Sequence, residues 1–171
     1  MSGPVTSDTG AVDTGAVNTG AVPAEKDLVE AIARELSARK TLDDLLGVEL
    51  LEMAAGYVKM RMTITDRMTN FYGSAHGGAI FALADSAFAY ACNSGNRITV
   101  AAGCSIEYLA PAHPGDVLTA TAQYRGGVGR QGIYDIDIHN QEGRLIATFR
   151  GKSHSTKDSI LPEAQALPPS E

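Results

Sequence analysis

Residues 70–90 read NFYGSAHGGAIFALADSAFAY, and this stretch predicts the centre of the fold. A polar loop and an HGG triplet lead into a long run of small and apolar residues. Such a run is typical of a helix that is covered on most sides, so we expect a central helix from about His76 to Asn93. Asp85 lies in the middle of this run. Because an unpaired buried carboxylate costs several kcal/mol, Asp85 needs a partner or a function.

The segments on both sides of this helix predict an antiparallel sheet. Before it, hydrophobic spacing predicts an amphipathic helix, a short turn closed by Gly47 and two strands, at residues 26–40, 42–46, 48–53 and 57–65. After it, turn signals at residues 112–116, 126–127 and 142–143 separate strands at 98–109, 117–125, 132–140 and 144–154. A meander of this kind has one face to cover, so we expect it to wrap around the central helix. This order predicts the α+β arrangement called the hotdog fold.

The two ends of the chain differ in composition from the middle. Residues 8–22 hold the tandem repeat DTGAV DTGAV NTGAV, whose five-residue period fits neither a helix nor a strand. The last residues contain three prolines and few large apolar side chains. We therefore expect a disordered tail at 1–24, one domain at 25–155 and a loose tail at 156–171.

The composition argues against several classes of protein. The 171 residues carry a net charge of -6, which argues against a nucleic-acid-binding surface. The only cysteines, Cys92 and Cys104, form no C-x-x-C pair and indicate neither a disulfide scaffold nor a metal site. No signal peptide is recognisable, and the apolar run is too short for a membrane span and contains Asp85. We expect a cytoplasmic protein that binds no membrane and needs no metal or cofactor.

The start of the central helix has the features of an oxyanion-binding site. Helix N-termini carry unpaired N–H groups and a partial positive charge. Gly77 and Gly78 would let a substrate carbonyl approach this backbone closely, although a glycine pair can also serve tight packing alone. His76 is either a helix cap or a substrate contact, and its neighbours favour the second interpretation.

Asp85 has the properties of a general base or a nucleophile, provided that something keeps it ionised. No basic partner lies on its own helix, because the positions three and four residues away hold Phe81, Ala82, Phe88 and Ala89. Gly77 and Asp85 lie about 12 Å apart along a helix, too far to act on one carbonyl within a single chain. We therefore expect a homodimer with antiparallel central helices, in which each active site combines groups from both chains.

Four stretches of the sequence resemble a known family. They are HGGAIFALADSAFAYACNS, CSIEYLAP, GIYDIDIHNQ and ATFRGKSH, within residues 27–155. Together they resemble the PaaI-type hotdog acyl-CoA thioesterases of phenylacetate degradation. The resemblance implies that Asp85 is the catalytic carboxylate and that the Gly77 N–H polarises the thioester carbonyl. It also implies that His76 and Asn70 orient the carbonyl and the loop, and that two dimers pair into a homotetramer.

The resemblance implies hydrolysis of an acyl-CoA to a free acid and CoA, with an aryl-acetyl group such as phenylacetyl or a hydroxylated relative. CoA is then part of the substrate, and no separate cofactor is implied. Asp85 either activates water or attacks directly to give a mixed anhydride, and the sequence leaves both routes open. Some relatives hold the water with a Ser at the position of Ala101, so Ser86 and Thr99 are the candidates here.

Further substrate contacts are expected around these groups. The candidates for binding the CoA phosphates are basic residues in or beside the last two strands, namely Arg130, Arg150 and Lys152. An acyl pocket at the partner's central helix and sheet would include the aromatic residues Phe71, Tyr72 and Phe88. The residues expected close to the thioester are Gly78 and Ser86.

Two other functions fit a fold of this kind. A hotdog hydratase or dehydratase needs a His-based acid–base pair, whereas this chain has an Asp nine residues after the His of the HGG triplet. A non-catalytic acyl-CoA-binding protein would need an output module, and residues 1–46 offer too little for a helix-turn-helix. The sequence therefore favours thioester hydrolysis over both alternatives.

Overall fold

The computed structural model describes residues 25–39 and 41–162. The repeat tail predicted at 1–24 and the end of the chain at 163–171 lie outside the described residues. The helical elements are α1 (Glu25–Ser37), α2 (Leu42–Leu46), η1 (Asp66–Met68) and α3 (Gly77–Asn93). The strands are β1 (Glu49–Ala54), β2 (Tyr57–Thr63), β3 (Thr99–Tyr108), β4 (Val117–Val128), β5 (Gln131–His139) and β6 (Leu145–Ser155).

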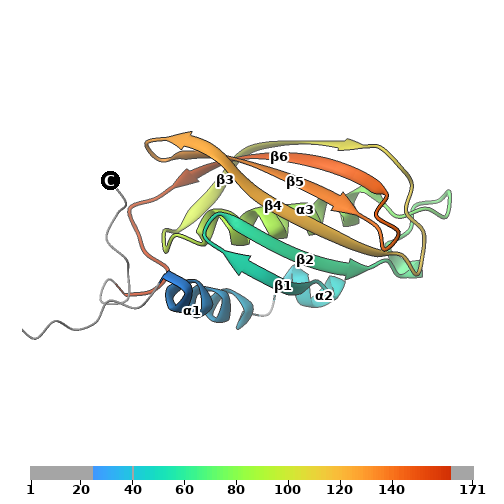
Figure 1. Cartoon of the computed structure of the whole chain (residues 1–171). Helices are drawn as coiled ribbons and strands as arrows, with labels where there is room; N and C mark the ends of the chain where they lie inside the picture. The colour runs from blue at the N-terminus through green and yellow to red at the C-terminus, as the bar shows by residue number, and fades with distance from the viewer. Residues whose placement is uncertain (1–24, 40, 163–171) are drawn as a thin grey trace, which may run out of the picture.

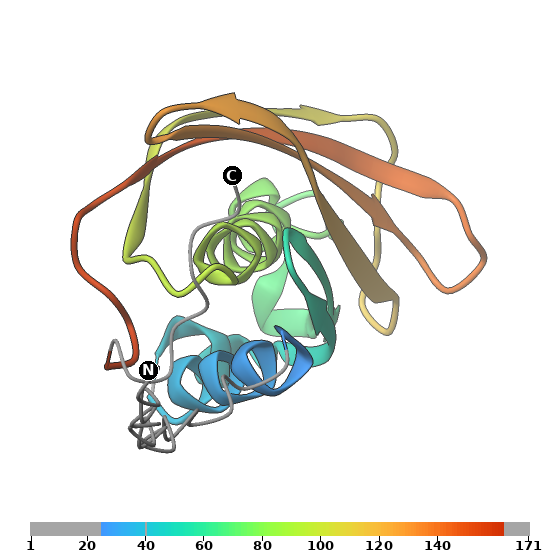
Figure 2. The ribbon, with the colours of Figure 1, turned by 60° about the vertical axis from the view of Figure 1, so that its left-hand side comes forward.

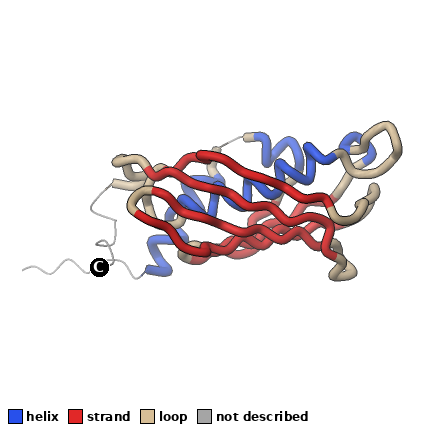
Figure 3. Tube along the Cα trace, turned by 90° about the horizontal axis from the view of Figure 1, so that it is seen from above, coloured by secondary structure: helices blue, strands red, loops and turns tan. Residues whose placement is uncertain are grey.

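The strands form one antiparallel sheet with the order β1-β2-β4-β5-β6-β3. The sheet curves around α3, and α1 lies on the side of α3 away from β4, β5 and β6 (Figure 1, Figure 2). Seen from outside, the sheet is covered by no helix in the part of the chain that the structure describes (Figure 3). The predicted α+β hotdog arrangement is confirmed. Among the described helices, none is both long and apolar enough to cross a membrane.

Side chains from α3 and from the concave face of the sheet form the core. The alternation predicted for the second strand is confirmed in β2, where Val58, Met60 and Met62 are buried. Phe88 of α3 is only 1% exposed, and its ring packs against the ring of Phe149. Because the sheet covers this ring, Phe88 is a core residue. Burial within one chain gives no support to the prediction that Phe88 lines an acyl pocket.

Gly151 of β6 leaves the space that the Phe88 ring fills. A Cβ atom at Gly151 would lie 2.7 to 2.8 Å from atoms of that ring. Gly151→Ala is therefore expected to lower the free energy of unfolding by about 1–3 kcal/mol, measured by urea denaturation, because the core has no room for a further atom. Gly95→Ala is the control, since a Cβ there would meet nothing within 4 Å. Equal stability of the two variants would contradict this account of the packing.

One predicted turn is a bulge inside a strand. The sequence predicts a turn at residues 126–127, but β4 continues past them and the turn into β5 lies at residues 129–130. The register of β4 against β5 shifts next to Gly126, which has a φ of 144°. A Cβ at Gly127 would lie 2.1 Å from the carbonyl oxygen of Gln131. The two glycines therefore permit a β-bulge and a close backbone contact.

The described part of the C-terminal segment lies against the loop that follows α3. The Asn96 side chain accepts from the Leu161 N–H at 2.8 Å and donates to the Leu161 carbonyl oxygen at 3.3 Å. The Ile98 N–H donates to the Asp158 carbonyl oxygen at 2.9 Å. These hydrogen bonds hold the chain against the domain as far as Leu161, beyond residue 155, where the sequence predicts a loose tail.

Candidate active site

The first turn of α3 presents two hydrogen-bond donors. His76 is the N-cap residue, and its Nδ1 accepts from the Gly78 N–H at 2.9 Å. A nitrogen that accepts carries no proton, so the hydrogen of the neutral ring lies on Nε2. Gly77 is the first helical residue, and its N–H meets no acceptor among the described residues. The Gly77 N–H and the His76 Nε2–H are therefore both available to a carbonyl oxygen.

Tyr108 of β3 connects the sheet to the first turn of α3. Its hydroxyl donates to the Gly77 carbonyl oxygen at 2.9 Å. A Cβ at Gly77 would lie 3.1 Å from both Cζ and Oη of the Tyr108 ring, so a larger residue here needs the exposed Tyr108 ring to shift by a few tenths of an ångström. Sequence reasoning missed Tyr108, because no local pattern connects residues that are 31 positions apart.

A pocket of about 390 Å³ opens beside the start of α3. Its lining includes Asn70, Gly77, Ile80 and Tyr108, and continues along residues 109–112. A cavity of this size accommodates a small aromatic acyl group. Asp85 is not among the residues that line it. Within one chain the pocket therefore contains the predicted oxyanion donor without the predicted base.

The loop before α3 is organised by Asn70. Its side-chain amide donates to Ser74 Oγ at 2.9 Å, and its Oδ1 accepts from the Tyr72 N–H at 2.9 Å. The rings of Phe71 and Tyr72 contact each other with centroids 4.1 Å apart and are 89% and 82% exposed. Within one chain both rings face solvent and do not line the pocket. Asn70 makes hydrogen bonds within the loop, and its role toward the carbonyl and the role of the two rings stay predictions.

Asp85 lies in the middle of α3, about 12 Å along the helix from Gly77. Its side chain is half-buried, and in the part of the chain that the structure describes it has neither a hydrogen-bond donor nor an ion-pair partner. Burial raises the pKa of this carboxyl above its usual range, and the nearby carboxylate of Asp43 raises it further. The side chain is therefore a stronger base than an exposed Asp, and its partner does not lie among the described residues.

The two candidates for holding the water differ in their surroundings. Ser86 donates its hydroxyl hydrogen to Asp43 Oδ1. Thr99 is buried, and its hydroxyl donates to the Arg97 carbonyl oxygen at 3.0 Å and lies 3.0 Å from Ser155 Oγ. Because the Thr99 hydroxyl is enclosed and committed to these partners, the structure does not support it as the group that holds the water.

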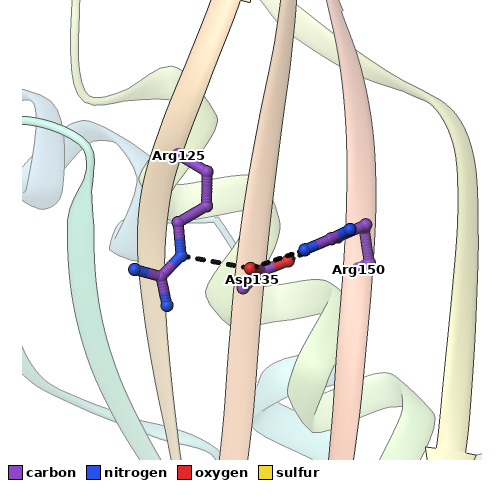
Figure 4. Close-up of polar contacts among 3 residues, drawn as sticks. All are labelled: Arg125, Asp135 and Arg150. Carbon is purple, nitrogen blue, oxygen red and sulfur yellow. Dashed lines mark hydrogen bonds and ion pairs between the residues drawn. The ribbon is translucent and has the colours of Figure 1, made fainter.

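The three basic candidates for CoA binding have different environments. Arg150 donates to both carboxylate oxygens of Asp135, at 2.6 and 2.8 Å, and Arg125 donates to the same carboxylate at 3.1 Å (Figure 4). These hydrogen bonds, that of Arg150 first, lower the pKa of Asp135. Arg130 in the β4–β5 turn and Lys152 on β6 have no ion-pair partner among the described residues. Arg150 therefore shares the Asp135 carboxylate with Arg125, whereas the other two have no such carboxylate among the described residues and are available to an anion.

Comparison with known proteins identifies the family. A model of the thioesterase superfamily matches residues 72–147, which include the HGG triplet, Asp85 and Tyr108. Acyl-coenzyme A thioesterase PaaI of Escherichia coli K12 is 48% identical over 119 residues, which cover 70% of this chain and 85% of that protein. The chain belongs to the thioesterase superfamily. A putative esterase of Archaeoglobus fulgidus is 31% identical over 138 residues, or 81% of this chain and 90% of that protein.

Solved structures of the thioesterase superfamily match as well. The E. coli PaaI protein from the phenylacetic acid degradation operon superposes with a TM-score of 0.77 at 40% identity, covering 80% of this chain and 99% of that chain. A hypothetical thioesterase with coenzyme A from Streptococcus pneumoniae superposes with a TM-score of 0.63 at 29% identity, covering 66% of this chain and 90% of that chain. The resemblance drawn from the four sequence stretches is confirmed.

Proposed function

We propose that this protein is a cytoplasmic acyl-CoA thioesterase that hydrolyses aryl-acetyl-CoA to the free acid and CoA. The observation that carries the proposal is the Gly77 N–H, which has no acceptor among the described residues, lies at a helix N-terminus and faces a pocket sized for a small acyl group. The 48% identity to an acyl-CoA thioesterase supports this substrate class. Both cysteines are free thiols, which suits a reducing compartment.

The active form is a homodimer, because Asp85 does not line the pocket of its own chain. β3 lies at the edge of the sheet and pairs only with β6. On its other side the Asn93 side chain bonds the N–H and carbonyl oxygen of Thr99, and the rest of that edge pairs with no strand among the described residues. The exposed apolar side chains in and just after β3 are Val100, Tyr108 and Leu109. An exposed edge of this length is a template for pairing with a second strand. Pairing of two β3 strands about a two-fold axis completes the sheet, and two such dimers form the proposed homotetramer.

In the proposed mechanism the Gly77 N–H of one chain binds the thioester oxygen, and His76 Nε2–H assists. Asp85 of the other chain removes a proton from water, whose oxygen attacks the carbonyl carbon. The C–S bond then breaks, and the CoA thiolate receives a proton. The alternative route, in which the Asp85 carboxylate attacks and water hydrolyses the resulting anhydride, has the same products. The positive end of the partner's α3 would also offset the negative charge of Asp85.

The substrate contacts follow from which side chains are free. Arg130 and Lys152 bind the CoA phosphates, because Arg150 is already paired with Asp135. The exposed Phe71 and Tyr72 rings cover the acyl group when the second chain closes the site. Stacking against an aryl group gives a reason for the preference for aryl-acetyl substrates over straight-chain ones.

Gly77→Pro tests the oxyanion donor directly. Proline has no N–H and is favoured at the first position of a helix, and the φ of -67° and ψ of 131° at His76 suit the residue before a proline. Gly77→Ala is the matched control, since it adds the same Cβ beside Tyr108 and keeps the N–H. We expect kcat of Gly77→Pro to be about 10²–10³ times lower than that of Gly77→Ala. Similar rates in both variants would exclude the Gly77 N–H as the oxyanion donor.

The proposed function is tested by thiol release from a panel of acyl-CoAs. We expect the highest kcat/KM for phenylacetyl-CoA and its ring-hydroxylated derivatives, and a lower value for straight-chain acyl-CoAs of similar size. Binding of these compounds without thiol release would instead favour a non-catalytic acyl-CoA-binding protein. Hydration of an enoyl-CoA without hydrolysis would favour the hydratase alternative.

A further inference from the structure

The short helix α2 is fixed beside α3 by capping at both ends. Thr41 accepts from the Asp43 N–H, and the Asp44 side chain accepts from the Thr41 N–H at 3.0 Å. Gly47 closes the other end in the left-handed conformation, and the Val48 N–H donates to the Asp43 carbonyl oxygen at 2.9 Å. The backbone of Asp43 is therefore held at both its N–H and its carbonyl group, and its side chain has a defined position.

The Asp43 carboxylate of α2 contacts the part of α3 that carries Asp85, the predicted base. Ser86 donates its hydroxyl to Asp43 Oδ1, across 43 positions of sequence. Ser86 directly follows Asp85, so this bond brings the Asp43 carboxylate against the turn of α3 that carries Asp85, and the Asp43 charge acts on the half-buried Asp85 side chain. A hydroxyl that donates its one hydrogen to a carboxylate can only accept from other groups. Ser86 therefore cannot donate to Asp85 or stabilise its ionised form.

The other titratable groups around Asp85 do not offset this charge. Burial raises the pKa of the Cys92 thiol to about 12, and burial raises the pKa of the Tyr90 hydroxyl, so both are neutral near pH 7. Asp43 is the charged group of the described residues that acts on Asp85, and no cation opposes it there. The electrostatic environment of Asp85 within its own chain is therefore set by burial and by one neighbouring carboxylate.

We propose that Asp43 is a positioning residue for Asp85: its carboxylate takes the hydrogen of Ser86 and holds a negative charge against the turn of α3 that carries Asp85. This inference rests on the proposed function, in which Asp85 is the base. Asp43 touches no reacting atom and acts only through Ser86 and through its field. The oxygen of Ser86 then presents lone pairs alone, which suits it to accept the second hydrogen of a water that donates its first to Asp85.

The test is the pH dependence of kcat/KM for Asp43→Asn with phenylacetyl-CoA. The amide oxygen still accepts from Ser86, but the charge is gone, so we expect the acid limb to move to lower pH. Glu142→Gln removes one charge from the exposed β5–β6 turn, and its acid limb should coincide with that of the wild type. Ser86→Ala keeps the Asp43 charge and should not move the acid limb to lower pH.

A carbon-13 NMR titration of the Asp85 carboxyl measures the effect of Asp43→Asn on the pKa of Asp85 without turnover. The Asp85 signal is assigned by its absence from the spectrum of Asp85→Asn. An acid limb and a titration curve of Asp43→Asn that coincide with those of the wild type would overturn the inference. A change in KM or in melting temperature alone would also overturn it, because that result describes a purely structural contact. If the wild type hydrolyses no acyl-CoA, the proposed function fails while the NMR titration still decides the role of Asp43.

Discussion

Asp85→Asn is expected to lower kcat for phenylacetyl-CoA by about a thousandfold, with a much smaller change in KM. The amide has nearly the shape of the carboxyl group but can neither remove a proton from water nor attack a carbonyl carbon. Thiol release at saturating substrate measures the loss. Asp137→Asn is the control, because Asp137 is an exposed carboxylate on β5 and is expected to leave kcat unchanged.

Asp85→Asn is also expected to be more stable than the wild type at neutral pH. The pKa of Asp85 is raised by burial and by Asp43, so the folded state binds the proton more tightly than the unfolded state. Ionised Asp85 therefore destabilises the fold above its folded pKa, and this penalty disappears as the pH falls through that pKa. The melting temperatures of Asp85→Asn and wild type should differ most near pH 7 and converge in acid. A full loss of activity with unchanged stability at every pH would contradict the raised pKa.

Mixing two inactive variants is expected to restore about a quarter of the wild-type activity. If equal amounts of Asp85→Asn and Gly77→Pro subunits assort at random, about half of the dimers contain one subunit of each kind. One of the two sites in such a dimer combines the intact Gly77 of one chain with the intact Asp85 of the other. Co-expression of the two variants, followed by a thiol-release assay, measures this recovery.

The control for this experiment is a doubly substituted subunit, Gly77→Pro with Asp85→Asn, co-expressed with either single variant. No combination of these chains contains an intact site, so we expect no recovery. Failure of the original pair to recover activity, with subunit exchange confirmed by mass spectrometry, would place both groups in the same chain and reject the shared site.

The elements that sequence reasoning predicted are those whose signals are local. The long apolar run, the alternation in β2 and the Gly47 cap each depend on neighbours a few positions away, and the structure confirms all three. The pair Gly126 and Gly127 misled the prediction, because a glycine pair permits a bulge as readily as a turn. Local patterns therefore predicted the elements and their order, but not each boundary.

The features that sequence reasoning missed are contacts between distant segments. Tyr108 meets Gly77 only because β3 crosses the start of α3, and Asp43 meets Ser86 only because α2 is fixed beside α3. Phe88 looked like a pocket residue because an aromatic ring on an apolar helix carries no mark of which face it occupies. Its burial against Gly151 depends on β6, which follows some sixty positions later in the chain.

One helix, α3, carries the proposed oxyanion donor at its first turn and the proposed base in its middle, and this arrangement has a genetic consequence. In the proposed dimer, a subunit with one defective group spoils only one of the two sites of a mixed dimer. A subunit in which both groups are defective spoils both sites, because each site takes one group from it. With equal expression of the two alleles and random assortment, an allele with both defects should therefore leave about a quarter of the sites active, whereas each single defect should leave about half.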